Sequence, residues 1–140
     1  MNATTKNVSR GLAAAALASA LTFPAQASDA DAIARGQTLY AAHCADCHGA
    51  GGEGTKDGPA VVGKGALPMN PPSGARMRES EFRTALDVAQ FVVKNMPGDD
   101  AGSLEAEEYW AILAFALHAN GVASSAPVDA ESAAKIVLHE

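Results

Sequence analysis

The stretch "AAHCADCHGAGGEG" (residues 41–54) contains both cysteines of this 140-residue chain. Cys44 and Cys47 lie three positions apart, and His48 follows the second cysteine directly. Two thiols at this spacing can form a disulfide, ligate zinc, act as a redox dithiol or attach a haem group. These four alternatives demand different surroundings, so the rest of the sequence discriminates among them.

Three of the alternatives fit the sequence poorly. A disulfide between positions three apart closes a very short loop and stabilises the chain little. A structural zinc site needs four ligands, usually from two separated pairs, whereas Cys44, Cys47 and His48 supply at most three. A thioredoxin-like dithiol is expected in a βαβ setting, of which the sequence carries no sign. The remaining pattern, C-x-x-C-H, is the attachment signature of a c-type haem.

The spacing of the motif also suits that chemistry. One helical turn separates Cys44 from Cys47, so each thiol can add to one of two neighbouring vinyl groups of the porphyrin. His48 then directs its ring at the iron, with Nε2 as the expected ligating atom. The motif therefore predicts one covalently attached haem c per chain, with His48 as a metal ligand.

Residues 1–27 have the three-part layout of a secretory signal peptide. Lys6 and Arg10 give a positive start, residues 11–23 form an apolar run of 13 residues, and residues 25–27 (Ala-Gln-Ala) form a small-x-small cleavage site. The apolar run is shorter than the roughly 20 residues that span a bilayer. We expect cleavage after Ala27 and export to the periplasm; the alternative is an uncleaved anchor.

The composition of the remaining 113 residues indicates one small domain. Without the signal peptide the chain has 8 basic residues against 16 acidic ones, a formal charge of −8. That charge argues against a nucleic-acid partner and against binding to anionic membranes. No segment after the signal peptide is long and apolar enough to cross a membrane. A domain of this size has a thin core and often needs a cofactor to stabilise it.

The hydrophobic pattern predicts an all-α fold with three main helices. The first runs from Ser28 or Asp29 to about His43, the second over residues 80–95, and the third over 104–119, capped by Ser103. Thr84 and Asp87 resemble a capping box in the second segment. The stretch 49–74 contains eight glycines and four prolines and is expected to be a loop. Residues 122–140 are read as a tail that ends in a short helix.

The chain resembles the exported class I monohaem c-type cytochromes of bacteria. The residues that carry the resemblance are Gly36, Tyr40, "CADCH" (44–48), "DGPAV" (57–61), "NMPGDD" (95–100) and "EYWAILAFALHANG" (108–121). The resemblance implies a cytochrome c domain over residues 28–121, with the long loop wrapped around one haem. It also implies that the first and last helices cross near Gly36, with Tyr40 packed on Phe115.

The same resemblance supplies roles for residues outside the motif. Pro59 would accept the Nδ1 proton of His48 on its backbone carbonyl and so raise the basicity of the ring; the alternative is an ordinary turn proline. Met96, before Pro97, would be the second axial ligand of the iron. Met69 is the second candidate for that position.

Other candidates depend on weaker signals. Met77 lies between two arginines and is expected to be exposed, and His118 is expected at the surface. Partners for the haem propionates are expected among Arg76, Arg78 and Trp110. The alternatives are that the arginines are simply solvated and that Trp110 belongs to the core.

The predicted function is that of a periplasmic electron carrier and not an enzyme, because both axial positions of the iron would be filled. It would work as a monomer or in transient complexes with a periplasmic dehydrogenase, a terminal oxidase or a reductase, and basic partner surfaces would suit its charge. Two alternatives stay open. The chain can be a dedicated dehydrogenase subunit that docks through residues 122–140, or a haem sensor or gas-binding protein with a labile Met96.

Overall fold

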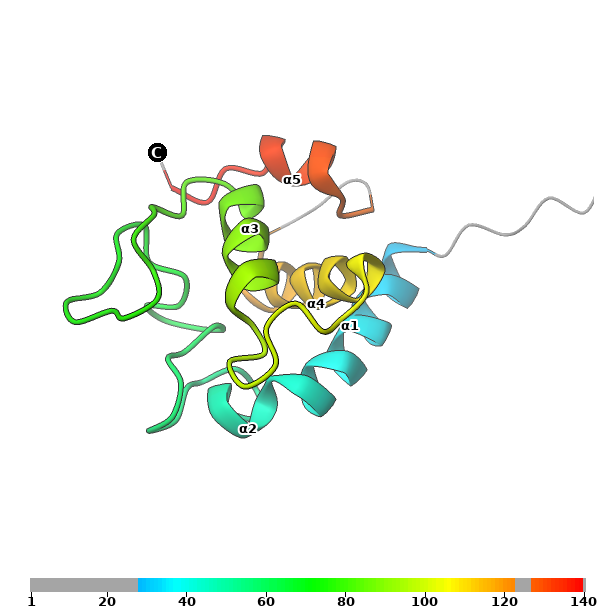
Figure 1. The fold of residues 1–140 in the computed structure, drawn as a ribbon. Helices are drawn as coiled ribbons and strands as arrows, with labels where there is room; N and C mark the ends of the chain where they lie inside the picture. Colours follow the sequence, from blue (N-terminus) through cyan, green and yellow to red (C-terminus); the bar gives the residue numbers. More distant parts are fainter. Residues whose placement is uncertain (1–27, 123–126, 140) are drawn as a thin grey trace, which may run out of the picture.

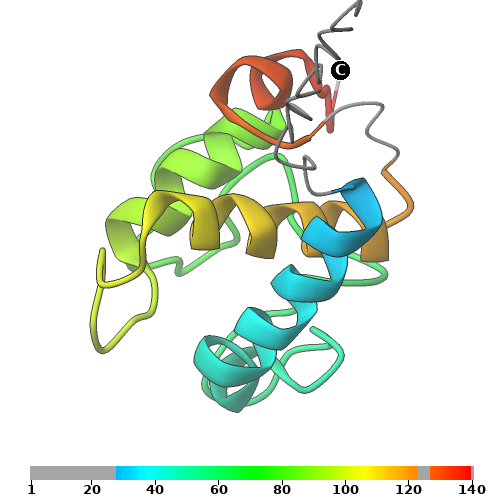
Figure 2. The ribbon, with the colours of Figure 1, turned by 90° about the vertical axis from the view of Figure 1, so that its right-hand side faces the viewer.

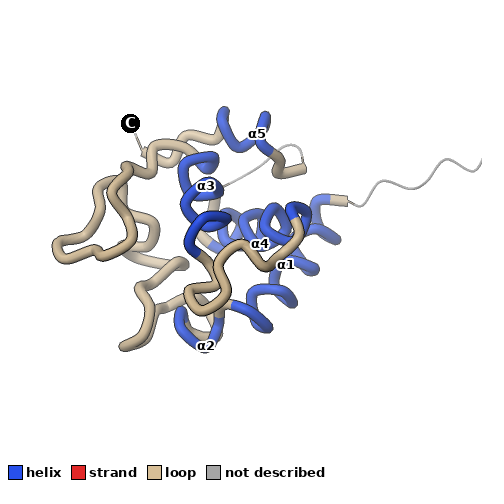
Figure 3. Tube along the Cα trace, in the orientation of Figure 1, coloured by secondary structure: helices blue, strands red, loops and turns tan. Residues whose placement is uncertain are grey.

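The computed structural model describes residues 28–122 and 127–139; the predicted signal peptide lies outside the described residues. The described chain forms five helices: α1 (Asp29–His43), α2 (Ala45–His48), α3 (Ala85–Asn95), α4 (Ala106–Ala119) and α5 (Ala130–Lys135) (Figure 1). Within the same residues, β-type pairing is confined to an isolated bridge between Thr84 and Val137. The prediction of an all-α fold is confirmed. Figure 3 shows that the long connection from α2 to α3 is loop.

The helix ends follow from local hydrogen bonds. Ser28 caps α1: its Oγ accepts from the backbone N–H of Asp31 at 3.3 Å, and the Asp31 carboxylate accepts from the N–H of Ser28 at 3.1 Å. Thr84 and Asp87 form the same reciprocal pair at the start of α3, as predicted. The last predicted helix begins later than expected. Its cap is Glu105 in place of Ser103, because the Glu108 carboxylate accepts the N–H of Glu105 at 3.0 Å.

Helices α1 and α4 cross, as Figure 2 shows. Gly36 of α1 lies at the point of closest approach to α4. A Cβ at Gly36 would overlap the carbonyl oxygen of Ala111 and lie 3.0 Å from the Cβ of Phe115. One turn further on, the rings of Tyr40 and Phe115 have centroids 5.3 Å apart and are tilted by 47°. The predicted crossing is therefore confirmed, and close backbone contact explains why a glycine occupies the middle of α1.

The hydrophobic core joins α3, α4 and α5. Its buried side chains are Phe82, Ala85, Val88, Ala89, Leu113, Leu117 and Ala133. Ala133 is fully buried, so the short helix in the tail contributes directly to this core. In Figure 1, α5 lies against the N-terminal end of α3.

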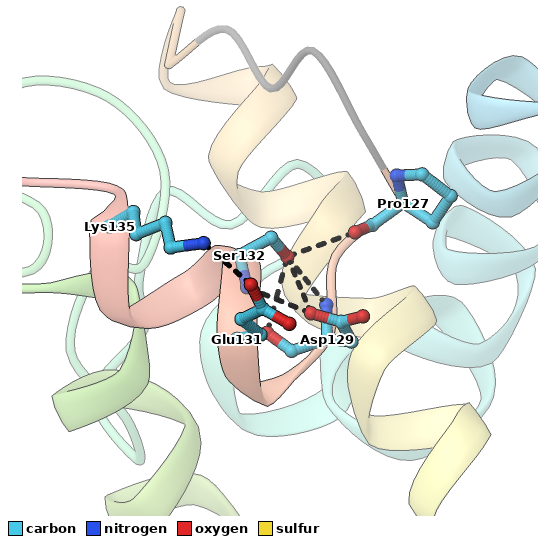
Figure 4. Close-up of polar contacts among 5 residues, drawn as sticks. All are labelled: Pro127, Asp129, Glu131, Ser132 and Lys135. Carbon is cyan, nitrogen blue, oxygen red and sulfur yellow. Dashed lines mark hydrogen bonds and ion pairs between the residues drawn. The ribbon is translucent and has the colours of Figure 1, made fainter.

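Hydrogen bonds and an ion pair among five residues between Pro127 and Lys135 fix α5 (Figure 4). The Asp129 carboxylate accepts from the backbone N–H of Ser132 at 2.8 Å, and Ser132 Oγ accepts from the N–H of Asp129 at 2.9 Å. Ser132 Oγ also donates to the carbonyl of Pro127 at 2.9 Å, while Lys135 pairs with Glu131 at 2.7 Å. This local capping makes a helix of only six residues possible.

The residues after α5 run alongside the beginning of α3. The N–H of Ala85 donates to the carbonyl of Ile136 at 3.0 Å, and the N–H of Leu138 donates to the carbonyl of Arg83 at 2.8 Å. His139 Nε2 lies 2.8 Å from the carbonyl oxygen of Leu67, 72 positions earlier in the chain. The described part of the tail thus packs on its own domain. This packing weakens the alternative in which residues 122–140 reach out to a partner.

Candidate haem site

The CADCH motif occupies the junction of α1 and α2. Cys44 ends α1 with φ −126° and ψ −32°, and the four residues Ala45–His48 then form a single helical turn. The carbonyl of Cys44 accepts from the N–H groups of Cys47 at 3.2 Å and His48 at 2.9 Å. The two cysteines are therefore separated by the one turn that the sequence predicted.

The two thiols differ in their surroundings. Both are free; Cys44 is half-buried and Cys47 is exposed. Burial, and secondarily the neighbouring Cys47, raises the pKa of Cys44 to about 11. Cys44 is consequently a neutral thiol at physiological pH in this structure. The two thiols thus lie one helical turn apart and neither is in a disulfide. Two thioether bonds to one porphyrin require this arrangement.

His48 is held by the loop that follows it. Its Nδ1 lies 2.7 Å from the carbonyl oxygen of Pro59. A carbonyl only accepts hydrogen bonds, so Nδ1 carries the proton and Nε2 keeps a lone pair for a metal. Gly58 permits this approach, because a Cβ there would lie 3.0 Å from His48 Nδ1 and 2.8 Å from the carbonyl oxygen of Cys47. Metal-ligating histidines typically donate their other ring N–H in this way, which fixes the orientation of the ring.

Met96 lies where α3 ends and is half-buried. Its carbonyl accepts from the hydroxyl of Tyr109 at 2.7 Å and from the N–H of Gly102 at 3.3 Å. α4 and the connecting loop thus fix the backbone of the candidate ligand. Met69 is also half-buried, whereas Met77 is 54% exposed, as expected. The assignment of Met96 as the second ligand stays a prediction.

Arg78 is nearly buried, with 8% of its surface exposed. Its Nη2 donates to the carbonyls of Pro68 at 2.8 Å and Met69 at 3.1 Å, and its guanidinium lies 3.9 Å above the centre of the Phe82 ring. Its Nε has no hydrogen-bond partner within residues 28–122 and 127–139. Burial lowers the pKa of this arginine, yet the group stays cationic. A buried cation with an unused donor is suited to an anionic group such as a haem propionate.

The other two propionate candidates gain no such support. Arg76 is exposed. Trp110 is half-buried, packs against the core and lines an apolar groove between α3 and α4; none of the motif residues lines that groove. For Arg76 and Trp110, the propionate role stays a prediction.

Two residues were missed as parts of the site. Asn120 had no predicted role in the site, but its Nδ2 donates to the carbonyl of Val61 at 2.9 Å and its Oδ1 accepts from the N–H of Gly63 at 3.0 Å. It thereby ties the loop after Pro59 to α4. Tyr109 likewise had no predicted role in the site, but its hydroxyl donates to the carbonyl of Met96 at 2.7 Å. No local sequence signal marks either contact, since each joins residues far apart in the chain.

Together these residues fit a haem of the c type. They supply two free thiols one turn apart, an imidazole with an available Nε2 and a buried guanidinium with an unused donor. By contrast, no group of three or more His, Cys, Asp or Glu side chains suited to a metal ion occurs in the described part of the chain. The donor set thus favours the haem over the zinc alternative.

Comparisons with known proteins point the same way. Residues 31–115 match the family model described as cytochrome c oxidase, cbb3-type, subunit III. The chain is 35% identical over 88 residues to a thiosulfate dehydrogenase of Stutzerimonas stutzeri (strain A1501), an alignment that covers 59% of this chain and 26% of the relative. The chain thus spans about a quarter of the length of that curated relative.

A solved structure is also similar. A chain in the crystal structure of the sulfane dehydrogenase SoxCD from Paracoccus pantotrophus superposes with a TM-score of 0.55 and 27% sequence identity, covering 76% of this chain and 52% of that one. The family match extends over more than half of the sequence and includes the whole CADCH motif. The chain therefore belongs to the family of the cbb3-type cytochrome c oxidase subunit III and is a monohaem c-type cytochrome.

Proposed function

We propose that this cytochrome is an exported electron carrier that holds its haem covalently through Cys44 and Cys47 and ligates the iron with His48 and Met96. The observation that carries the proposal is the 2.7 Å contact between His48 Nδ1 and the Pro59 carbonyl, next to two free thiols. The bound haem supplies a one-electron Fe(II)/Fe(III) couple.

The protein's own groups would set the properties of that couple. The Pro59 carbonyl fixes the ring of His48 and raises its basicity. The thioether of Met96 favours the reduced iron and so raises the reduction potential. The Tyr109 hydroxyl holds the Met96 backbone in place, and Arg78 would compensate the charge of a propionate. With His48 and Met96 as its ligands, the iron would offer no open position to a substrate.

The electron donor is proposed to be a dehydrogenase that oxidises inorganic sulfur compounds. The two similar proteins are named as a thiosulfate dehydrogenase and the sulfane dehydrogenase SoxCD. The alignments cover only 26% of the first and 52% of the second, so the catalytic activities in their names are not assigned to this chain. Stable co-purification with such an enzyme would favour the dedicated-subunit alternative, whereas recovery of the cytochrome alone would favour a mobile carrier.

Export to the periplasm is part of the proposal, because it rests on the sequence of residues 1–27. No helix in residues 28–122 or 127–139 is long and apolar enough to cross a membrane.

Covalent attachment predicts that the unfolded holo-protein has no reactive thiol. Cys44 and Cys47 are the chain's only cysteines, so two thioether bonds leave none to react. The measurement is a thiol titration with Ellman's reagent in guanidinium chloride after a reductant has opened any disulfide and has been removed. The control is the apo-protein treated in the same way, which is expected to give two thiols per chain. Two reactive thiols per chain in the native sequence would show that the haem is not covalently bound.

Filled axial positions predict that the reduced protein does not bind carbon monoxide rapidly at neutral pH. The measurement is the visible spectrum of the dithionite-reduced protein before and after the addition of carbon monoxide. An unchanged spectrum is expected for an electron carrier. A spectral shift within seconds would contradict this function and support the sensor or gas-binding alternative.

A further inference from the structure

An apolar groove of about 270 Å³ lies between α3, α4 and the loop that joins them. Its walls include Ala89 and Val93 of α3, Leu104 of the loop, and Tyr109 and Trp110 of α4. Val93 is 45% exposed, so the apolar surface reaches solvent. The volume is below the range of about 300–1,000 Å³ typical of small-molecule sites and suits single protein side chains.

The rim of this groove is acidic. The stretch 95–110 contains five carboxylates and no lysine, arginine or histidine; the carboxylates are Asp99, Asp100, Glu105, Glu107 and Glu108. Four of them are exposed and Glu108 is half-buried. None takes part in a salt bridge within the described ranges. Three of them, Glu105, Glu107 and Glu108, are direct chain neighbours of residues that line the groove. The exposed Lys94, next to Val93, is a cation in the same position, so the charges beside the apolar floor are predominantly negative.

The groove is also connected to the proposed distal ligand. Tyr109 and Gly102 line it, and both donate hydrogen bonds to the carbonyl of Met96, at 2.7 Å and 3.3 Å. A molecule seated in the groove therefore contacts residues that hold Met96. If Met96 ligates the iron as proposed, a partner in the groove would lie one hydrogen bond away from the backbone of an iron ligand.

We propose that this groove is the docking site for the redox partner, a protein that presents an apolar side chain surrounded by lysine or arginine residues. The inference rests on the proposed function as an electron carrier. An apolar centre with a charged rim is the usual anatomy of a protein interface, and the carboxylates select a basic partner. A second copy of this chain is disfavoured, because it would bring the same five carboxylates against each other.

The test uses the ¹⁵N-labelled holo-protein and the peptide Lys-Lys-Leu-Lys-Lys as a probe at low ionic strength. We expect chemical-shift changes concentrated at Val93, Leu104 and the indole N–H of Trp110. Lys-Lys-Ser-Lys-Lys is expected to bind more weakly, because it lacks the apolar side chain. Changes spread over other surfaces, no changes, or equal binding of both peptides would overturn the proposal.

Matched variants separate the groove from net charge. Glu105→Gln/Glu107→Gln is expected to raise the dissociation constant of the leucine peptide by roughly twofold to thirtyfold, from the loss of two charge pairs of about 0.2–1 kcal/mol each. The control Asp29→Asn/Glu79→Gln removes the same amount of charge at exposed positions away from the groove. It should change the dissociation constant of the leucine peptide less than twofold. An equal effect of the two double variants would overturn the assignment. Reversible redox titration of the same samples reports on the proposed function separately, so normal redox behaviour without peptide binding contradicts only the docking site.

Discussion

Replacing Met96 by alanine is expected to lower the midpoint potential by on the order of 0.1 V, within the roughly 0.8 V range that axial ligands set. The thioether favours Fe(II), and alanine offers no replacement ligand. Spectroelectrochemical titration of the holo-protein measures the shift. Two further changes are expected in this variant: loss of the weak far-red band of thioether-bound Fe(III), and rapid binding of carbon monoxide by the reduced protein.

The control for this prediction is Met69→Ala. Met69 is also half-buried, but it lies in the loop before α3, where its carbonyl accepts from Arg78 and Phe82 through backbone atoms that alanine keeps. We expect Met69→Ala to retain the potential and the far-red band. If Met69→Ala loses them and Met96→Ala keeps them, Met69 is the ligand and the assignment of Met96 is wrong.

Replacing Gly36 by valine is expected to destabilise the holo-protein by about 3 kcal/mol or more. A Cβ at this position overlaps the Ala111 carbonyl oxygen and lies 2.6 Å from the Ala111 carbonyl carbon, and these are backbone atoms that cannot rotate away. The crossing of α1 and α4 must therefore widen, which separates Tyr40 from Phe115. Urea denaturation followed by circular dichroism measures the loss of unfolding free energy.

Ala41→Val is the matched control for Gly36→Val. Ala41 is exposed on the same helix, so valine there costs only helix propensity, at most about 0.7 kcal/mol. A similar small loss for both variants would show that the helices do not meet closely at Gly36 in solution.

Local signals in the sequence predicted much of the fold. Ser28 with Asp31 and Thr84 with Asp87 start α1 and α3 through contacts three residues apart, which a sequence displays directly. The crossing at Gly36 followed from a glycine placed against expectation in a helix and from the family resemblance. The start of α4 was misplaced by two residues, because both Ser103 and Glu105 can cap a helix and the Glu108 carboxylate favours the second.

Contacts between distant segments could not be predicted in the same way. The packing of α5 on α3 depends on main-chain hydrogen bonds between Arg83–Ala85 and residues 136–139, whose side chains carry no pairing signal. The burial of Arg78 is likewise invisible locally, since its partners are the backbone carbonyls of Pro68 and Met69. In the candidate site, the CADCH motif was readable because its chemistry fixes the spacing. The hydrogen bonds from Tyr109 to Met96 and from Asn120 to Val61 could not be predicted, because they join segments that are far apart in the sequence.

A reductive and then oxidative potentiometric titration of the purified holo-protein, followed by visible absorbance, tests whether the chain carries single electrons on one haem. We expect one Nernstian wave with n = 1 for the single CADCH motif, superimposable in both directions. Two or more waves, or an iron that cannot be reversibly oxidised and reduced, would contradict this expectation.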